Sequence, residues 1–136
     1  MASVHSEVLI EARPEDLWAA LRDVGNVHRL FRGVVTDARL EGDIRVVAFA
    51  NGSVVRERVV TVDGERRRVV YASVRDGLVH HSASMQVFAE GEGRSRFVWI
   101  SDFLPDSLEA SIRPLVELGT AALKRTTEGQ VQPGTP

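Results

Sequence analysis

The chain has 136 residues, a formal net charge of −2 and no cysteine. This length suits one domain with one hydrophobic core, and the lack of cysteine excludes disulfides, thiolate metal sites and a cysteine nucleophile. The slight negative charge argues against binding to nucleic acid or to an anionic membrane, and no apolar run approaches the roughly 20 residues of a membrane span. Because the N-terminus lacks an apolar signal-peptide core, we expect a cytoplasmic protein.

The first part of the chain predicts one strand and two short helices. Residues 4–11 alternate between apolar and polar side chains, which indicates a half-buried opening strand. Pro14 suits the first turn of a short helix, and Glu15 and Asp16 lie near its positive end. Residues 27–31 indicate a second short helix.

Six further strands are expected in the middle of the chain. Each is a short alternating segment, and glycine-containing turns separate them. The expected strands are residues 34–40, 44–50, 54–62, 67–74, 79–89 and 94–103. Strands joined by such tight turns form an antiparallel meander, with the opening strand paired to one of its edges.

The C-terminal segment, residues 108–127, predicts one long amphipathic helix that closes the sheet. Its apolar residues recur at steps of three and four: Leu108, Ile112, Leu115, Gly119, Ala122 and Leu123. Its regular part should begin near Ser111, which could cap it and would leave Pro114 in the first turn. We expect a single domain over residues 1–127 and a frayed polar tail over residues 128–136.

A twisted sheet around one helix leaves a space between them, and small residues predict that this space is a pocket. Gly119 thins the helix, and residues 82–84 thin the facing strand. A ligand pocket would have a volume of roughly 300 Å³ or more. In the alternative, Met85, Phe97 and Trp99 fill the gap.

Glu57 is the strongest candidate for a catalytic residue. Val55 and Val59 share its face of the strand, whereas Arg56 and Arg58 share the opposite face, which can hardly be the core. Glu57 should therefore point inward. A buried carboxylate costs several kcal/mol unless it is paired or protonated, so it needs a partner.

The turn after the preceding strand decides which residue that partner is. A three-residue loop over residues 50–52, with its glycine in the left-handed conformation, places Arg45 opposite Glu57 and turns Phe49 inward. A two-residue loop places Val46 there instead. We predict the three-residue loop, because it gives the carboxylate a cationic partner.

His81 is the second candidate. It alternates with Ala83 and Met85 on the more apolar face of its strand, so His81 should face the cavity and His80 the solvent. An inward histidine near an inward glutamate would form an acid–base pair. The alternative is a core histidine that is hydrogen-bonded to a hydroxyl group.

Tyr71, the only tyrosine, is the third candidate. Its phenol could hold a ligand carbonyl or could be satisfied by the backbone. Trp99 and Phe97 are expected to form a wall of the pocket. Because His80 and His81 are adjacent in a strand, their rings point to opposite faces and cannot share an ion, and we predict neither a metal site nor a cofactor.

These segments together resemble a known family. The resemblance lies in residues 10–18, in Asn51-Gly52, Glu57-Arg58 and Tyr71, in Phe97-Val98-Trp99, and in residues 119–124. The chain resembles the START-like (SRPBCC) helix-grip superfamily, and within it the polyketide cyclase/dehydrase branch. The resemblance implies an α+β fold: a seven-stranded antiparallel sheet around a long C-terminal helix, two short helices after the first strand, and a hydrophobic ligand cavity. Members include cyclases, aromatases, lipid carriers and hormone receptors. The short loop at residues 50–52 argues against the mobile gate of the related abscisic acid receptors.

The predicted function is binding of a hydrophobic small molecule, polyketide-like or aromatic, with cyclisation or dehydration by acid–base chemistry as one form. The alternatives are a non-catalytic carrier or sensor, and a partner-binding protein with a vestigial cavity. An open sheet edge leaves the oligomeric state undecided, including a homodimer. The candidate catalytic residues are Glu57, His81 and Tyr71. The candidate ligand-binding residues are Arg45, Val47, Phe49, Val59, Ala83, Met85, Phe97, Trp99, Leu115 and Gly119.

Overall fold

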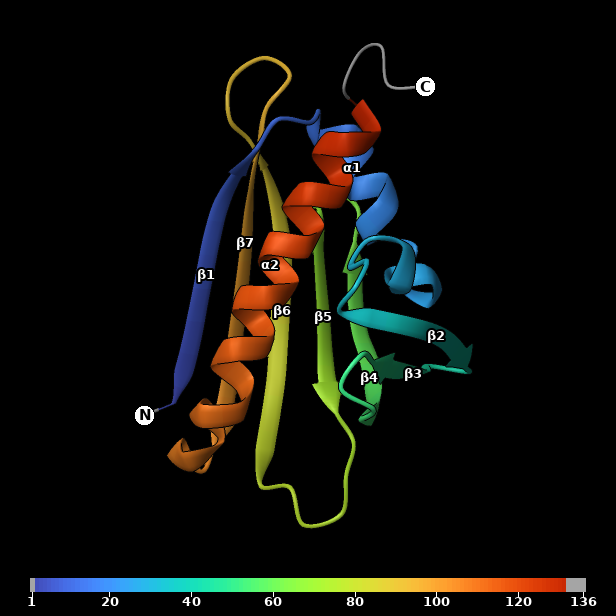
Figure 1. Cartoon of the computed structure of the whole chain (residues 1–136), viewed down its shortest axis with the longest axis vertical. Coiled ribbons are helices and arrows are strands. Elements are labelled where there is room, and N and C mark those ends of the chain that lie inside the picture. Colours follow the sequence, from blue (N-terminus) through green and yellow to red (C-terminus); the bar gives the residue numbers. More distant parts are fainter. Residues whose placement is uncertain (1, 132–136) are drawn as a thin grey trace.

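The computed structural model describes residues 2–131 and shows a curved sheet around one long helix (Figure 1). The strands are β1 (Ser3–Ile10), β2 (Val35–Glu41), β3 (Ile44–Phe49), β4 (Val54–Asp63), β5 (Arg68–Ser73), β6 (His80–Ala89) and β7 (Ser95–Leu104). The helices are α1 (Pro14–Leu21), the 3-10 segments η1 (Val24–Arg29) and η2 (Asp106–Leu108), and α2 (Glu109–Val131). The predicted α+β helix-grip fold is confirmed.

The seven strands form one antiparallel sheet in the order β1-β7-β6-β5-β4-β3-β2. Strands β2 to β7 make the predicted meander, since each pairs with the next along the chain. The opening strand β1 pairs with β7, so the first and last strands of the chain are neighbours in the sheet. Helix α2 crosses the concave face, and its first turns lie near the same end of the sheet as the β5–β6 loop (Figure 1).

The β3–β4 hairpin has the predicted three-residue loop. The Phe49 N–H donates to the Ser53 carbonyl at 2.9 Å, and the Gly52 N–H donates to the Phe49 carbonyl at 2.9 Å. Gly52 has a φ of +91°, a backbone conformation that glycine adopts without steric cost. The resulting register places Arg45 opposite Glu57, as predicted.

Helix α2 starts earlier and ends later than expected. It begins at Glu109, because η2 runs directly into it and has already formed the first turn. Ser111 is therefore not the cap, and its hydroxyl donates to the Leu108 carbonyl at 3.1 Å. At the other end, Glu128 accepts hydrogen bonds from Lys124 and from the backbone of Glu11, so the helix continues to Val131. The rest of the expected tail, 132–136, lies outside the described residues.

The hydrophobic core lies where the concave face of the sheet meets α1, η1 and the later turns of α2. Its fully buried side chains include Ile10, Leu17, Leu21, Phe97 and Leu123. This packing fixes the helix against one end of the sheet. Toward the other end a cavity lies between the helix and the sheet, and the candidate site lies there.

Candidate functional site

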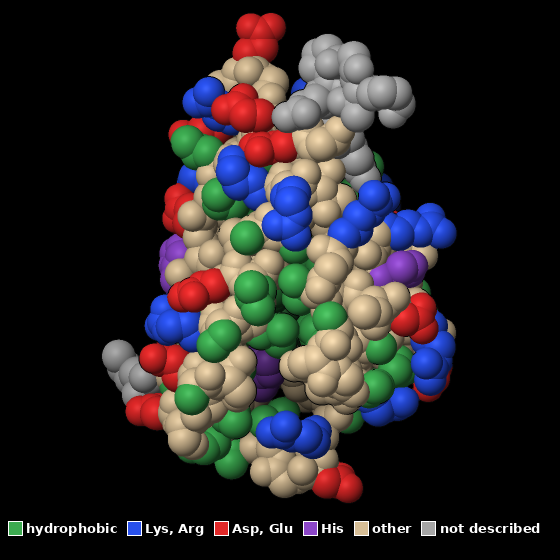
Figure 2. Space-filling model, in the orientation of Figure 1, with side chains coloured by type: hydrophobic (Ala, Val, Ile, Leu, Met, Phe, Trp, Pro, Cys, Tyr) green, Lys and Arg blue, Asp and Glu red, His purple; other side chains and the backbone are tan. Residues whose placement is uncertain are grey.

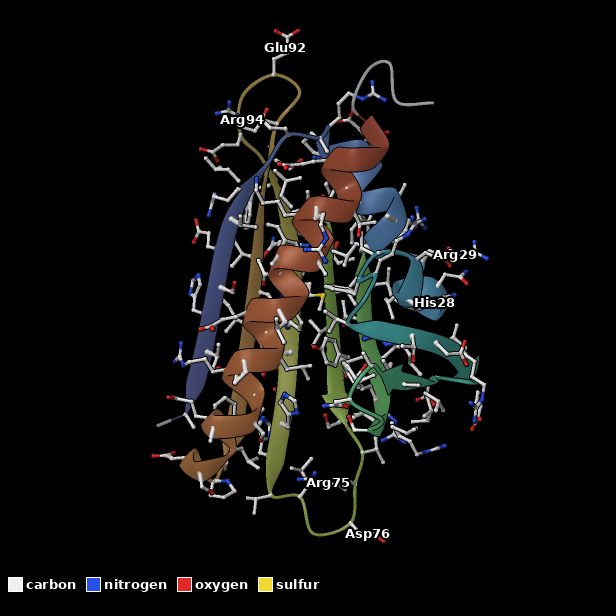
Figure 3. The ribbon with its side chains drawn as sticks, in the orientation of Figure 1. His28, Arg29, Arg75, Asp76, Glu92 and Arg94 are labelled. Atoms are coloured by element: carbon white, nitrogen blue, oxygen red, sulfur yellow. The ribbon has the colours of Figure 1, made fainter. Side chains whose placement is uncertain are left out.

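A cavity of about 910 Å³ lies between the sheet and the first half of α2. Its wall includes residues of β4 to β7, the β3–β4 turn, the β5–β6 loop and the helix residues Leu108, Ile112, Leu115 and Val116. Figure 2 shows that this end of the face is hollowed and that hydrophobic side chains surround the hollow. The β5–β6 loop, with Arg75 and Asp76, lies at the open end (Figure 3). Phe97, Trp99 and Met85 do not fill the gap.

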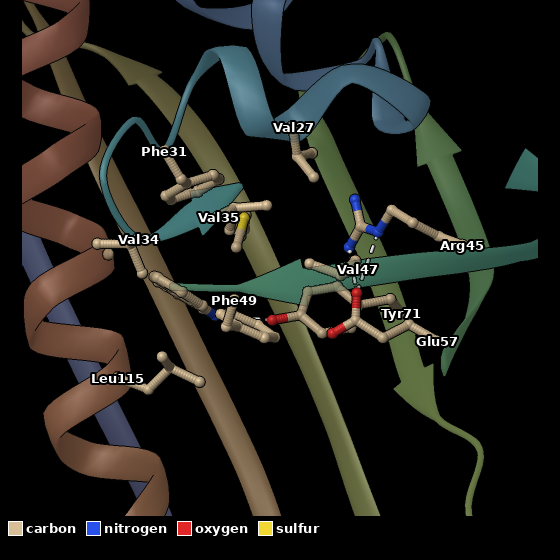
Figure 4. A pocket seen from close by; sticks show the side chains of 13 residues that line it. Val27, Phe31, Val34, Val35, Arg45, Val47, Phe49, Glu57, Tyr71 and Leu115 are labelled. Atoms are coloured by element: carbon tan, nitrogen blue, oxygen red, sulfur yellow. Dashed lines mark hydrogen bonds and ion pairs between the residues drawn. The ribbon is translucent and has the colours of Figure 1, made fainter. Parts of the chain in front are cut away.

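A small recess of about 40 Å³ lies deeper, toward η1 and β3 (Figure 4). Its apolar wall includes Val27, Phe31 and Val47, and its polar side chains are Arg45, Glu57 and Tyr71. The recess and the main cavity share wall residues, namely Phe49, Glu57, Tyr71, Trp99 and Leu115. These shared residues form the boundary between the two spaces.

Arg45 and Glu57 form a buried ion pair at this boundary. Arg45 Nε and Nη2 lie 3.0 and 2.9 Å from Glu57 Oε1, and the two residues are 4% and 7% exposed. Arg45 Nη1 also donates to the Val24 carbonyl of η1 at 3.3 Å. Burial raises the pKa of the Glu57 carboxyl, while the charge and hydrogen bonds of Arg45 oppose that rise. The predicted proximity of the two residues is confirmed.

Only one of the two carboxylate oxygens is used in this pair. Both Arg45 contacts end on Glu57 Oε1, and no donor reaches Oε2 within the described range, residues 2–131. Since Glu57 lines both the cavity and the recess, a free acceptor is available on the cavity wall.

Tyr71 is held beside this pair. Its hydroxyl oxygen accepts a hydrogen bond of 3.2 Å from Trp99 Nε1, and the Arg45 guanidinium carbon lies 5.0 Å from the centre of its ring. Burial, with the nearby charge of Glu57, raises the pKa of the phenol, so it remains protonated. The Tyr71 oxygen thus bonds Trp99 rather than the backbone, and its hydroxyl hydrogen has no acceptor in the described part of the chain.

His81 faces the cavity and His80 faces solvent, as the alternation predicted. The ring lies between two serine hydroxyls, with Nδ1 2.8 Å from Ser73 Oγ and Nε2 2.8 Å from Ser101 Oγ. Burial, and then the charges of His80 and Arg75, lower the pKa of His81, which favours a neutral ring near pH 7. One nitrogen must then donate to a serine and the other must accept.

His81 and Glu57 are not in contact. They lie on β6 and β4 with β5 between them, which separates their backbones by about 10 Å. Ser73 of β5 pairs with Glu57 in the sheet register and bonds His81 through its side chain. Of the two alternatives for His81, the hydrogen bond to a hydroxyl group is therefore the one that the structure shows. The ring also lines the cavity.

We expect His81 to make the protein less stable at mildly acidic pH. Its folded pKa lies below the reference value of 6.5, so the unfolded chain binds more protons as the pH falls through that value. The contribution to stability is complete above about pH 6.5 and is lost progressively below it. Urea unfolding of the wild type and of His81→Gln across roughly pH 5 to 8 tests this expectation. The wild type should show the steeper pH dependence, and equal slopes would contradict the assignment, with His5→Gln on β1 as the exposed control.

Most of the predicted site residues line these two spaces. Arg45, Val47, Phe49, Met85, Trp99, Leu115 and Gly119 lie on the wall, as do Glu57, Tyr71 and His81. Val59, Ala83 and Phe97 do not. Phe97 and Ala83 are packed into the core, and Val59 lies beyond Glu57 next to a β-bulge in β4. Alternation gives the face of a strand but not the position along it, and the cavity occupies only the open end.

Sequence reasoning did not identify the two serines as part of the site. Ser73 and Ser101 alternate with Tyr71 and Trp99, so the strand period already placed them on the inner face. Their contact with His81 depends on the pairing of β5, β6 and β7. The β5–β6 loop also contributes wall residues for which the sequence offered no signal, and η1 contributes Val27.

Gly119 is required for the packing of Trp99 against α2. A Cβ atom at this position would lie 2.7 Å from Trp99 Cζ3, closer than side chains normally approach. We expect Gly119→Ala to destabilise the protein by about 1–3 kcal/mol through overpacking, despite the better helix propensity of alanine. Gly129→Ala, where a Cβ meets nothing within 4 Å, is the matched control in the same helix. It should be neutral or stabilising in thermal unfolding, and equal effects at both positions would contradict the expectation.

The fold and the cavity define a class of protein: a helix-grip domain whose cavity wall combines apolar and polar side chains. Residues 1–133 match the family described as polyketide cyclase/dehydrase and lipid transport, and the chain belongs to this family. The resemblance inferred from sequence motifs is thereby confirmed. No curated protein matches the sequence. Within residues 2–131, no helix is both long and apolar enough to span a bilayer.

Solved structures with the same fold are similar over nearly the whole chain. An uncharacterised protein from Bacillus thuringiensis has a TM-score of 0.84 at 17% identity, with 93% of this chain and 98% of that one covered. The di-domain ARO/CYC BexL from the BE-7585A biosynthetic pathway has a TM-score of 0.81 at 13% identity, covering 98% of this chain and 48% of that one. Norcoclaurine synthase from Thalictrum flavum, in complex with dopamine and hydroxybenzaldehyde, has a TM-score of 0.68 at 18% identity, covering 98% and 88%. At these identities the similarity establishes the fold alone.

Proposed function

We propose that this protein binds a hydrophobic small molecule, aromatic or polyketide-like, in the cavity between the sheet and α2. The single observation that supports this proposal most directly is the cavity of about 910 Å³, which is mostly apolar and presents the Glu57 carboxylate. A volume near the upper end of the range for small-molecule sites would hold a molecule of several rings. It argues against a vestigial cavity.

Acid–base turnover of the bound molecule is the second part of the proposal. In an aldol cyclisation with dehydration, a base removes a proton next to a carbonyl group and an acid protonates the departing hydroxyl. Glu57 and a neutral His81 are the available bases, and Tyr71 can donate a proton to an oxygen. The description of the family as polyketide cyclase/dehydrase and the ARO/CYC name of BexL support this chemistry.

Binding without turnover is the competing function, and one observation favours it. Both nitrogen atoms of His81 already bond serine hydroxyls, so a substrate would have to displace one of them before the ring could act as a base. A carrier or sensor needs no such displacement.

The homodimer considered from the sequence stays a prediction.

The proposal can be tested first without knowing the ligand. Native mass spectrometry of the protein as purified is expected to show a mass above that of the chain, from a bound hydrophobic molecule that organic solvent extracts. Glu57→Gln and His81→Ala then separate the two functions for that molecule. Loss of turnover with retained affinity supports an enzyme, whereas affinity changes without any turnover in the wild type support a carrier.

A further inference from the structure

At the boundary between the cavity and the recess, two polar groups each use only part of their hydrogen-bonding capacity. Glu57 Oε2 is an acceptor without a donor, and the Tyr71 hydroxyl hydrogen is a donor without an acceptor, among residues 2–131. Both side chains line both spaces (Figure 4), and they lie on the neighbouring strands β4 and β5, where Tyr71 is two residues from Ser73, the register partner of Glu57. Once a ligand excludes solvent from these two groups, each needs a partner on the ligand, because a buried polar group without a partner is costly.

A hydroxyl group is the simplest group that satisfies both at once. Its hydrogen can be donated to Glu57 Oε2, and its oxygen can accept the Tyr71 hydrogen. An ether or a ketone offers only the acceptor and leaves the carboxylate oxygen bare. An apolar substituent at this point leaves both polar groups without partners.

The charges around this point also select a neutral ligand. The positive charge of Arg45 is already matched by the Glu57 carboxylate at 2.9 Å. Tyr71 and His81 are neutral at pH 7, as described above. Arg56 and Arg75 line the cavity but are exposed, where water screens them. A carboxylate or an ammonium group placed at the inner boundary would therefore be buried without a counter-charge.

We propose that the ligand presents a neutral hydroxyl group, phenolic, enolic or alcoholic, to Glu57 and Tyr71 at the inner end of the cavity. This inference rests on the proposed function and adds to it the chemical class and the orientation of the ligand. The hydroxyl group lies at the boundary with the recess, and the apolar body of the ligand extends toward α2 and the β5–β6 loop.

A series of probes with one skeleton tests the inference in the wild-type protein. The probes are 2-naphthol, 2-methoxynaphthalene, 2-methylnaphthalene and 2-naphthoate, and affinity is measured by fluorescence titration at pH 7. We expect 2-naphthol to bind about tenfold or more tightly than the methoxy and methyl compounds, because it alone gains a hydrogen bond to a charged group. The carboxylate should bind most weakly. Equal affinities for 2-naphthol and 2-methoxynaphthalene would overturn the hydroxyl inference.

Two variants assign the preference to the named groups. In Glu57→Gln the amide oxygen can face Arg45 and the amide nitrogen then faces the ligand, so the preference for hydroxyl over methoxy should disappear. Tyr71→Phe should weaken binding of 2-naphthol and of 2-methoxynaphthalene and leave 2-methylnaphthalene unchanged. Glu90→Gln, a change at an exposed carboxylate paired with Arg96, should behave as wild type. A preference that survives in Glu57→Gln would overturn the assignment.

The outcomes separate this inference from the proposed function. Binding of all four probes with the same affinity would leave a hydrophobic cavity and remove the hydroxyl site. No binding of any probe to the wild type would count against both. If Glu57→Gln fails to fold by circular dichroism, the wild-type series and Tyr71→Phe still decide the question.

Discussion

Replacement of Arg45 by leucine is expected to lower the free energy of unfolding by about 3–5 kcal/mol, because it leaves the Glu57 carboxylate buried without its cation. The pair is almost fully buried, so bulk water is a poor substitute for Arg45. Without Arg45, nothing opposes the burial that raises the pKa of Glu57. A carboxyl with a raised folded pKa favours folding at low pH and loses that contribution as the pH rises through the folded pKa. The loss in Arg45→Leu should therefore be larger at pH 7 than at acidic pH.

The double variant Arg45→Leu/Glu57→Leu should recover most of this loss, since it removes both charges and fills the space with apolar atoms. Arg58→Leu is the matched control. Arg58 lies on the neighbouring strand β4, and its ion pair with Asp43, at 3.1 Å, is exposed. Its removal should therefore change stability little. Urea unfolding at two pH values provides the measurement. A single variant as stable as the wild type at pH 7, or a double variant less stable than the single one, would show that the pair does not behave as a buried ion pair.

Filling the cavity from the helix side is expected to abolish ligand binding while the fold remains. Ile112 and Leu115 are half-buried and their side chains line the cavity wall. The variant Ile112→Trp/Leu115→Trp would put two indole rings into the space that the ligand needs. We expect affinity for 2-naphthol, or for the co-purified molecule, to fall about a hundredfold. Each indole ring would clash with the ligand, and a clash of this kind has a cost similar to that of overpacking a core. Stability should be close to that of the wild type, since the rings enter an unfilled space.

The control for this prediction lies on the other face of the same helix. Glu117 and Leu118 are exposed, and Leu118 is 61% exposed. Glu117→Trp/Leu118→Trp adds the same two rings without approaching the cavity, so affinity should stay at the wild-type value. If both double variants bind the probe as the wild type does, the ligand site is not in this cavity and the proposed function is wrong.

The sequence by itself determined the elements and the faces of the strands. A strand repeats every two residues, so the alternation placed Glu57 and His81 inward and Arg56 and His80 outward. The glycine at position 52 and the need to pair a buried carboxylate were enough to select the hairpin register. Both signals are local, because they depend on neighbours along one chain segment, and both agree with the structure.

The tertiary structure alone decided the position of the cavity and the partners of His81 and Tyr71. The packing of Trp99 against Gly119 fixes the helix at one end of the sheet, and the space opens at the other end. Phe97 and Ala83 are inward but lie in the packed region, so they are core residues. His81 bonds two serines rather than Glu57, because β5 lies between the two candidate residues. Distances across strands and along the helix axis depend on contacts between distant segments, and a repeat along one segment contains no information about them.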